Sequence, residues 1–491
     1  MNRPAWTRVL TGVAVLALTG GVVATAGALP DPAPPDPVAP QRVALPAGDA
    51  VRVCPPAPRL LQTADAPGTD EALAARALTT TTVRALAPGS QLDRSDLDRA
   101  GAVLRAIPPA GEPAGEAAVL AATATALTPE GDLRGLAVAD CPAPVEDGWA
   151  VAGTVAAGWA NRLVLTNPGA TPVVVDVTVL TGAGAVAPQP VQGLALAPGE
   201  STETLLDGLV PDAGPLAVRV EAAGGRVAAA VLQSRLDGLL PQGVATVGAT
   251  ADPAEHLVVP GAVVRGGSPA PWLRVAVPGE EDAVVRWALL GPDGPVTVEG
   301  ATAATVPAGT VAEVPLDGLP DGDYTAVVDA DVPVLAGVRS RLGASGRPAD
   351  IGWAAATQPL GDGALVALPD GPDGDVETRL LLAAPDGAAD VTVRAVDADG
   401  AELAVTEVPV AAHSTTVADL DADRGAEPGD GQAAGWWVEA AGEGAATVTA
   451  SLLVLADAAD GGRLLSVVPV RPLPDPPGDV EVRVPLPGRW P

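Results

Sequence analysis

The clearest pattern in the chain is an alternation of apolar and polar positions. Between residues 173 and 179 valine occupies every second position, and Asp176 and Thr178 stand between valines. The same spacing recurs at Val285, Trp287 and Leu289 and at Val391, Val393 and Ala395. A period of two places alternate side chains on opposite faces of a strand and does not fit a helix. Each segment therefore predicts a strand with one buried face.

Each alternating strand belongs to a longer unit that occurs three times. The units begin at Leu163, Leu273 and Leu380 and read as strand, proline turn, strand and glycine turn. A later hairpin, with Gly224 and Gly225 at its tip in the first unit, also repeats. The spacing of about 110 residues is typical of an immunoglobulin-sized domain. The predicted fold is all-β, with three tandem immunoglobulin-like β-sandwich modules behind an N-terminal export segment and a disulfide-tied β-containing region.

The repeats set the predicted domain boundaries. The predicted segments are a signal peptide or signal anchor (1–29), a proline-rich linker (30–50), a disulfide-tied N-terminal region (51–144), three β-sandwiches (145–254, 255–360 and 361–471) and a proline-rich tail (472–491). Within the N-terminal region only 117–127 and 134–141 have the pattern of strands. Part of 55–115 is expected to be helical or disordered.

The N-terminus has the pattern of an export signal. Arg3 and Arg8 precede an uncharged run, 9–29, that ends in small residues suited to cleavage. The run is also long enough to span a bilayer, so a cleaved signal peptide and an uncleaved membrane anchor both stay open. Either reading places the remainder outside the plasma membrane. We therefore expect an extracytoplasmic protein, either secreted or attached to the membrane through this segment.

Two cysteines, Cys54 and Cys141, occur in the whole sequence. In an exported chain an even pair predicts a disulfide ahead of a metal or catalytic site. Such a bond would close a long loop and remove roughly 4 kcal/mol of chain entropy from the unfolded state. The disulfide would stabilise a region that is poor in predicted strands.

Composition narrows the classes of function. The formal net charge is −32 with a pI near 4.2, which disfavours binding to phosphate backbones and hence to nucleic acid. The same charge would attract divalent cations or a basic partner, although it also simply maintains solubility. Phenylalanine is absent, and every basic residue is arginine. This bias is typical of a GC-rich genome and weakens alanine as evidence for helix.

The sequence offers little catalytic chemistry. Its two histidines, His256 and His413, are far apart, and no nucleophile elbow, phosphate loop or zinc-protease motif occurs. No enzymatic activity is therefore expected, and no cofactor apart from calcium. A calcium-loop pattern is formed by Asp419, Asp421, Asp423 and Asp430. Its glycine stands one place late and no helices are predicted around it, so a solvated acidic loop is the alternative.

Two further features are candidate interaction sites. Trp437 follows Trp436 on a predicted strand, so one indole faces the core and the other, Trp437 by alignment of the repeats, faces away. It would serve either a sugar or protein partner or a contact between modules. Arg235 and Arg341 belong to Ser-Arg-Leu sequences that end the same hairpin in two units. The alternative for these arginines is structural capping of a strand end.

One passage resembles a known family. Residues 134–180 contain Cys-Pro, a Trp- and Gly-rich stretch, Leu-Val-Leu-Thr-Asn-Pro and a valine-alternating strand, and the hairpin at 224–236 also fits. These features resemble actinobacterial large secreted proteins of a family of unknown function, membrane-anchored or secreted. The third repeat departs from the pattern, with Ala384-Pro385 where the first has Asn167-Pro168. The resemblance implies an envelope or extracellular location and carries no catalytic residues.

These observations lead to two hypotheses of function. The first is a non-enzymatic extracytoplasmic cell-envelope protein, a structural or protein-interaction scaffold with an unknown envelope partner. The alternative is a cell-wall polysaccharide-binding β-sandwich protein, which requires several exposed aromatic side chains on one sheet face. The chain contains nine tryptophans and one tyrosine, so its composition favours the scaffold.

Overall fold

The computed structural model describes residues 13–14, 16–18, 41–43, 48–59, 78–85, 91–97, 101–108, 119–370, 376–420, 433–473 and 480–482. The chain divides into two compact units, Met1–Leu45 with Gly478–Pro491, and Pro46–Pro477. In the first unit β1 (Gln41–Val43) pairs antiparallel with β35 (Val480–Val482). No helix among the described residues combines the length and apolarity needed to cross a bilayer. Most of the predicted export segment lies outside the described residues.

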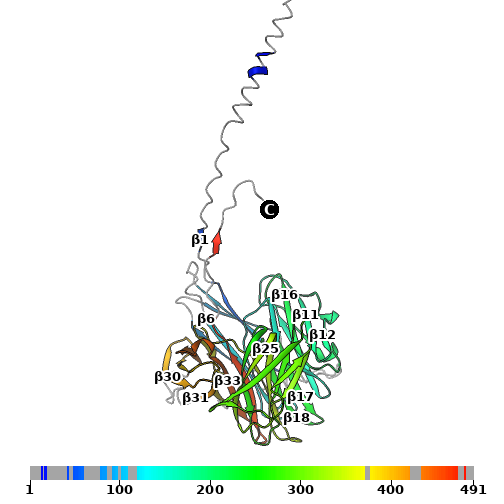
Figure 1. Cartoon of the computed structure of the whole chain (residues 1–491), viewed down its shortest axis with the longest axis vertical. Coiled ribbons are helices and arrows are strands. Elements are labelled where there is room, and N and C mark those ends of the chain that lie inside the picture. Colours follow the sequence, from blue (N-terminus) through cyan, green and yellow to red (C-terminus); the bar gives the residue numbers. More distant parts are fainter. Residues whose placement is uncertain are drawn as a thin grey trace, which may run out of the picture. The chain divides into compact units, whose positions relative to one another are not determined.

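The Pro46–Pro477 unit consists of β-sheets (Figure 1). Its first module has one sheet ordered β12-β11-β16-β8, with β13 also on β11, and a second ordered β14-β10-β17-β18. The strands are β8 (Asp147–Ala150), β9 (Thr154–Val155), β10 (Trp159–Thr166), β11 (Val173–Thr181), β12 (Gly184–Val186), β13 (Leu194–Leu196), β14 (Ser201–Leu205), β15 (Gly214–Pro215), β16 (Ala217–Ala223), β17 (Ala228–Asp237) and β18 (Leu240–Val247). Short 3-10 helices lie at Gln189–Val191 and Leu206–Gly208, and in the third module at Ala445–Thr447.

The second and third modules repeat this plan. The second contains β19 (Ala254–Val264), β20 (Trp272–Ala276), β21 (Ala283–Gly291), β22 (Gly294–Val296), β23 (Ala303–Val306), β24 (Val311–Pro315), β25 (Gly322–Leu342) and β26 (Asp350–Ala355). The third contains β27 (Ala364–Ala367), β28 (Val376–Ala384), β29 (Ala389–Val396), β30 (Glu402–Val410), β31 (Ser414–Asp419), β32 (Gly435–Ala441), β33 (Thr449–Asp457) and β34 (Arg463–Val470). The long β25 belongs to both sheets of its module, because its first half pairs with β19 and β21 and its second half with β20 and β26.

The predicted alternation fills a hydrophobic core in each of the three modules. Val175, Trp287 and Val393 are buried on β11, β21 and β29, and each lies in the hydrophobic cluster of its own module. Asp176, between two buried valines, faces solvent. The all-β prediction and the burial of alternate valines are therefore confirmed.

The immunoglobulin-like strand order is not what the modules show. In the first module the opening strand β8 pairs with β16, and β17 pairs with β10. The third module has the same pairings, of β27 with β32 and of β33 with β28. An immunoglobulin sandwich places its first strand beside the second and its seventh beside the sixth. The period of the repeat is that of a two-layer sandwich, but a period alone does not determine which strands are neighbours.

The N-terminal region is a fourth module on the same plan. Its strands are β2 (Ala50–Cys54), β3 (Leu78–Ala85), β4 (Gln91–Asp96), β5 (Ala102–Ile107), β6 (Val119–Thr128) and β7 (Gly135–Asp140). They form sheets ordered β2-β5-β4 and β3-β6-β7, which match the two sheets of the first module without β12, β13 and β14. The strands β3, β4 and β5 were not predicted by the sequence pattern, and the remainder of 55–115 that was expected to be partly helical or disordered lies mostly outside the described residues. The polar β4 is a strand because it pairs along its length with β5.

The predicted disulfide is present in this N-terminal module. Cys54, at the end of β2, is bonded to Cys141, just after β7, with their Cα atoms 4.3 Å apart. Both cysteines are buried in the module's small core. A structural disulfide indicates an oxidising, extracytoplasmic environment.

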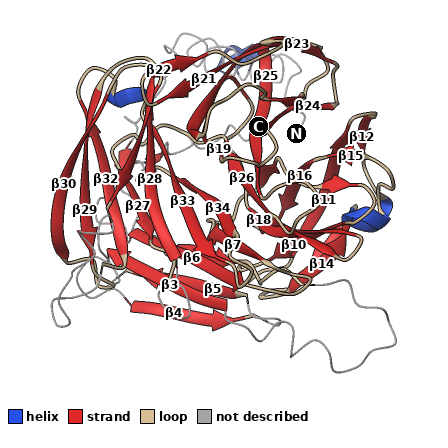
Figure 2. Cartoon of the chain, turned by 90° about the horizontal axis from the view of Figure 1, so that it is seen from below, coloured by secondary structure: helices blue, strands red, loops and turns tan. Residues whose placement is uncertain are grey.

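The last strands of the four modules pack together at the centre of this unit (Figure 2). Strand β7 contacts β18 and β34, and β26 contacts the same two strands. Each central strand also contributes apolar side chains to the core of a neighbouring module: Leu136 to the third, Leu465 to the second, Ile351 to the first, and Val244 to a cluster of the N-terminal module. The four modules are therefore joined in a closed ring, in which each core includes a side chain from a neighbouring module.

Candidate functional site

A buried carboxylate lies where the four central strands meet. Asp350 begins β26 and is fully buried. Its Oδ2 accepts hydrogen bonds from the amides of Leu136 (3.0 Å) and Leu465 (2.9 Å), and its Oδ1 from those of Val244 (3.2 Å) and Ile351 (3.0 Å). These amides belong to β7, β34, β18 and β26, the four strands that meet at the centre. One side chain therefore binds all four modules.

Burial dominates the protonation of Asp350 and raises its pKa to about 7, although the four backbone hydrogen bonds act in the opposite direction. Two glycines leave room for the carboxylate. A Cβ on Gly135 would stand 2.6 Å from Oδ1, and one on Gly243 would stand 2.5 Å from it. Gly243 also has a positive φ of 109°, which disfavours any other residue. All four hydrogen bonds of Asp350 are to the central strands, so the group is architectural.

Two arginines at the ends of the central strands also connect the modules. Arg134, before β7, donates to the carbonyl of Ala349 (3.0 Å) in the second module and to Asp460 (2.9 Å) in the third. Arg471, after β34, donates to Asp140 (2.6 Å) and to a carbonyl of the first module's end, Ala249. Each guanidinium therefore crosses more than one module boundary.

The junction of the first and second modules contains a ladder of alternating arginine and tryptophan side chains. Arg235 lies over Trp159 with its guanidinium carbon 4.8 Å from the ring centroid, and Arg339 lies 5.5 Å from the same ring. Arg339 also contacts Trp353 (5.9 Å), on which Arg274 lies at 4.5 Å. Cation–π contacts of this kind gain strength when they are removed from water. The ladder thus joins β10 and β17 to β20, β25 and β26.

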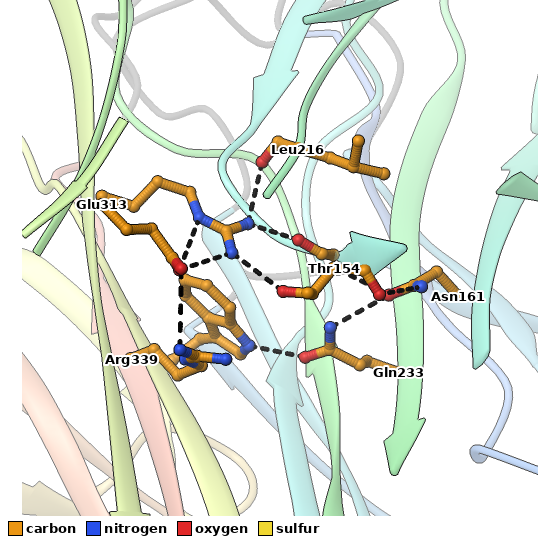
Figure 3. A network of polar contacts seen from close by, with 9 residues as sticks. Thr154, Asn161, Leu216, Gln233, Glu313 and Arg339 are labelled. Carbon is orange, nitrogen blue, oxygen red and sulfur yellow. Dashed lines mark hydrogen bonds and ion pairs between the residues drawn. The ribbon is translucent and has the colours of Figure 1, made fainter. Parts of the chain in front are cut away.

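Arg274, at the inner end of the ladder, is fully buried and forms the polar network of Figure 3. It donates to Glu313 Oε1 (2.7 Å from Nη2), to Thr154 Oγ1 (3.0 Å) and to the carbonyls of Leu216 (2.9 Å) and Gly153. Burial lowers the pKa of Arg274 to about 10, with Glu313 opposing the shift. Because its partners come from both modules, this guanidinium fixes the junction.

The network continues through side-chain amides. The indole of Trp353 donates to Gln233 Oε1 (2.7 Å), and Gln233 donates to Asn161 Oδ1 (2.9 Å). Asn161 in turn donates to the carbonyl of Thr154 (2.8 Å). Nearly every donor is matched to an acceptor, so the junction is a rigid and specific contact.

An open cleft of about 670 Å³ adjoins the same junction. The first module supplies Asp147, Trp149 and Arg219, from β8 and β16. The connection between modules and the second module supply the other lining residues: Asp252, Pro253, Pro278, Gly279, Glu280, Glu281, Val332 and Pro333. The lining therefore combines proline and valine walls with four carboxylates and one guanidinium.

The positive group of the cleft is already neutralised. The guanidinium of Arg219 donates to both carboxylate oxygens of Asp147 (3.0 and 2.6 Å), lies 3.2 Å from Glu221, and stacks 5.4 Å from the ring centroid of Trp149. The hydrogen bond to Asp147 is the main cause that raises the pKa of Arg219. The other three carboxylates, Asp252, Glu280 and Glu281, form no hydrogen bond or ion pair with the described residues.

The structure separates the residues predicted as sites. Arg235 belongs to the ladder, while Arg341 donates to Gln242 Oε1 (2.6 Å) and to the carbonyl of Gly343 (3.1 Å). Trp436 lies in the third module's core, whereas Trp437 is half-buried beside residues of β6 and donates to Glu439 (2.7 Å). Both arginines and Trp437 thus lie at contacts within the ring.

The calcium pattern falls mainly outside the described residues, which include Asp419 at the end of β31 but exclude Asp421, Asp423 and Asp430. In the part of the chain that is described, no group of three or more His, Cys, Asp or Glu side chains is arranged to hold a metal ion.

Sequence reasoning missed Asp350, Arg274 and the cleft. A signal for two of them existed, because a charged residue opens the apolar strand sequence DIGWAA and another interrupts LRVAV. Such a charge has to be paired if the strand is buried on both faces.

Comparison with known proteins identifies the family. Residues 96–421 match the family described as "Family of unknown function (DUF5719)", and the chain therefore belongs to it. No curated protein and no solved structure matches the chain at significant similarity.

Proposed function

We propose that this chain is a non-enzymatic protein of the cell envelope that acts outside the cytoplasm as a structural or protein-interaction scaffold. The observation that carries the proposal is the use of its buried polar groups. Asp350, Arg274 and Arg134 all form hydrogen bonds across module boundaries. These buried charged groups therefore hold the modules in a fixed arrangement. A rigid body with an open cleft at a module junction suits the presentation of surfaces to a partner.

Two features support a location outside the cytoplasm. The disulfide requires an oxidising compartment, and the apolar N-terminal run with its proline-rich sequel is typical of a secreted or membrane-attached protein.

The polysaccharide alternative gains no support from the described tryptophans. Four tryptophans are buried: Trp149, Trp287, Trp353 and Trp436. Among the described residues, Trp272 is the one tryptophan that belongs to the exposed large apolar side chains. A sugar-binding face requires several exposed rings side by side.

Crosslinking in intact cells tests the proposal. A photo-reactive amino acid would be placed at Leu239, which is 93% exposed at a hairpin tip, and separately at Gly279 in the cleft. We expect a protein partner to crosslink reproducibly at one or both positions. We also expect no binding of the purified chain to a cell-wall glycan array. Glycan binding without any protein crosslink would overturn the scaffold and favour the alternative.

A further inference from the structure

We infer that the inter-module cleft binds an extended segment of a partner protein that carries arginine or lysine. This inference rests on the proposed scaffold function and names the chemistry of its partner. The cleft walls are formed by Trp149, the prolines and Val332, which suit the methylene stem of a long basic side chain. The carboxylates of Asp252, Glu280 and Glu281 in its lining supply the matching charge.

A comparison with another module junction shows why this cleft remains open. Between the N-terminal and first modules, Arg105 on β5 pairs with Asp49 and also donates to the carbonyl of Pro168 (3.0 Å), in the first module's proline turn. At the cleft, Arg219 on the corresponding strand β16 pairs with Asp147 and Glu221 and forms no bond to the proline turn of the second module. The acidic turn Pro278–Glu281 therefore faces the cleft without a cationic partner from its own chain.

The arrangement favours a peptide over a point cation. No three carboxylates among the described residues converge on one metal position, so the negative charge of the lining is not gathered at one point. Spread charge over apolar walls fits a chain that passes through the cleft with basic side chains at intervals. The overall charge of −32 would speed the approach of such a segment.

Titration of the full chain with labelled probe peptides tests the inference. The probe is a fluorescein-labelled peptide of alternating arginine and proline, with alternating glutamate and proline as the counter-probe. The combined variant D252N/E280Q/E281Q is expected to weaken binding of the basic probe by about tenfold, because three charged contacts of the lining are lost. The counter-probe is expected not to bind the natural chain.

A matched control separates the cleft from the general acidic field. The combined variant D386N/D390N/E443Q removes three exposed carboxylates of the third module, and its affinity is expected to stay within about twofold of the natural chain. Equal weakening in both variants would assign binding to net charge and overturn the inference. Displacement of the probe by calcium at equimolar concentration would overturn it in favour of a metal site.

The crosslinking positions distinguish this inference from the proposed function. A protein captured at Gly279 through an arginine- or lysine-bearing peptide supports both. A protein captured at Leu239 but never at Gly279 leaves the scaffold standing and removes the cleft as its binding site. Absence of protein capture at both positions overturns both together.

Discussion

Individual buried charged side chains hold strands of different modules together, because each accepts or donates several hydrogen bonds at once. Asp350 offers four lone-pair positions to four backbone amides, which an asparagine cannot do. The amide NH₂ of an asparagine would direct its donors at other donors in a fully buried place. The carboxylate is therefore specific at this position even though its burial is costly.

Substitution of Asp350 by asparagine is expected to destabilise the chain by about 4 kcal/mol, because two amides lose their acceptor in the interior. Denaturant unfolding monitored by tryptophan fluorescence would measure the change. Asp390→Asn, an exposed strand carboxylate, is the matched control and is expected to change stability by less than about 0.5 kcal/mol. Similar stability of the two variants would show that Asp350 does not hold the four strands.

The pKa of Asp350 also predicts how stability depends on pH. Burial raises this pKa to about 7 from 3.8. The folded chain then binds the proton more tightly than the unfolded chain, so the group's contribution is complete below about pH 4 and is lost as pH rises through 7. The difference in unfolding free energy between the natural chain and Asp350→Asn should shrink between pH 5 and about pH 8. A difference that grows over this range would contradict the raised pKa.

The contribution of Arg274 to stability is expected to depend on the planar, branched shape of its guanidinium as well as on its charge. Arg274→Lys keeps the charge but cannot reach Glu313 and two carbonyls of the first module together, so a loss of about 3 kcal/mol is expected. Hydrogen exchange should increase in β9 and β15, next to the lost contacts. Arg226→Lys, at an exposed ion pair with Glu146, is the control and should leave both measurements unchanged.

At the scale of elements, the disulfide connects the first strand of the N-terminal module to the end of its last strand. Since β7 is also a central strand, Cys54–Cys141 stabilises the ring as well as its own module. Replacing both cysteines by serine is expected to cost about 4 kcal/mol, because the bond closes a loop with a sequence separation of 87 residues. Unfolding in guanidinium, with and without reductant, measures the loss. Insensitivity of the natural chain to reductant, with the bond shown to be cleaved, would contradict it.

The sequence predicted the strands of the repeats well because alternation reports burial on one face. The valines of β11 and the paired indoles of β32 show this, since Val175 and Trp436 point inward as expected. It predicted the N-terminal module poorly, because β4 is mostly polar, packs only Leu92 against the core and owes its conformation chiefly to pairing with β5. Strand order was also beyond reach, since the contact of β8 with β16 is made between segments far apart in the chain.

The arrangement of the modules was the least predictable level. A tandem repeat predicts similar units in succession, but it contains no information on whether the last unit returns to the first. In this chain the return depends on particular side chains, Arg134 and Arg471, and on the meeting of β7 with β34. The cleft arises at the same level, because its two walls come from different repeats.

The closed ring makes a prediction about the whole molecule. Independent sandwiches on a string would unfold separately, whereas modules that share core residues and the Asp350 carboxylate lose their mutual support together. We expect one calorimetric transition for the Pro46–Pro477 unit, with van't Hoff and calorimetric enthalpies that agree. Asp350→Asn removes a shared bond, so it should lower the temperature of this transition and broaden or split it. Separate transitions in the natural chain would show that the modules are energetically independent, in which case a fixed cleft between the first two could not be maintained.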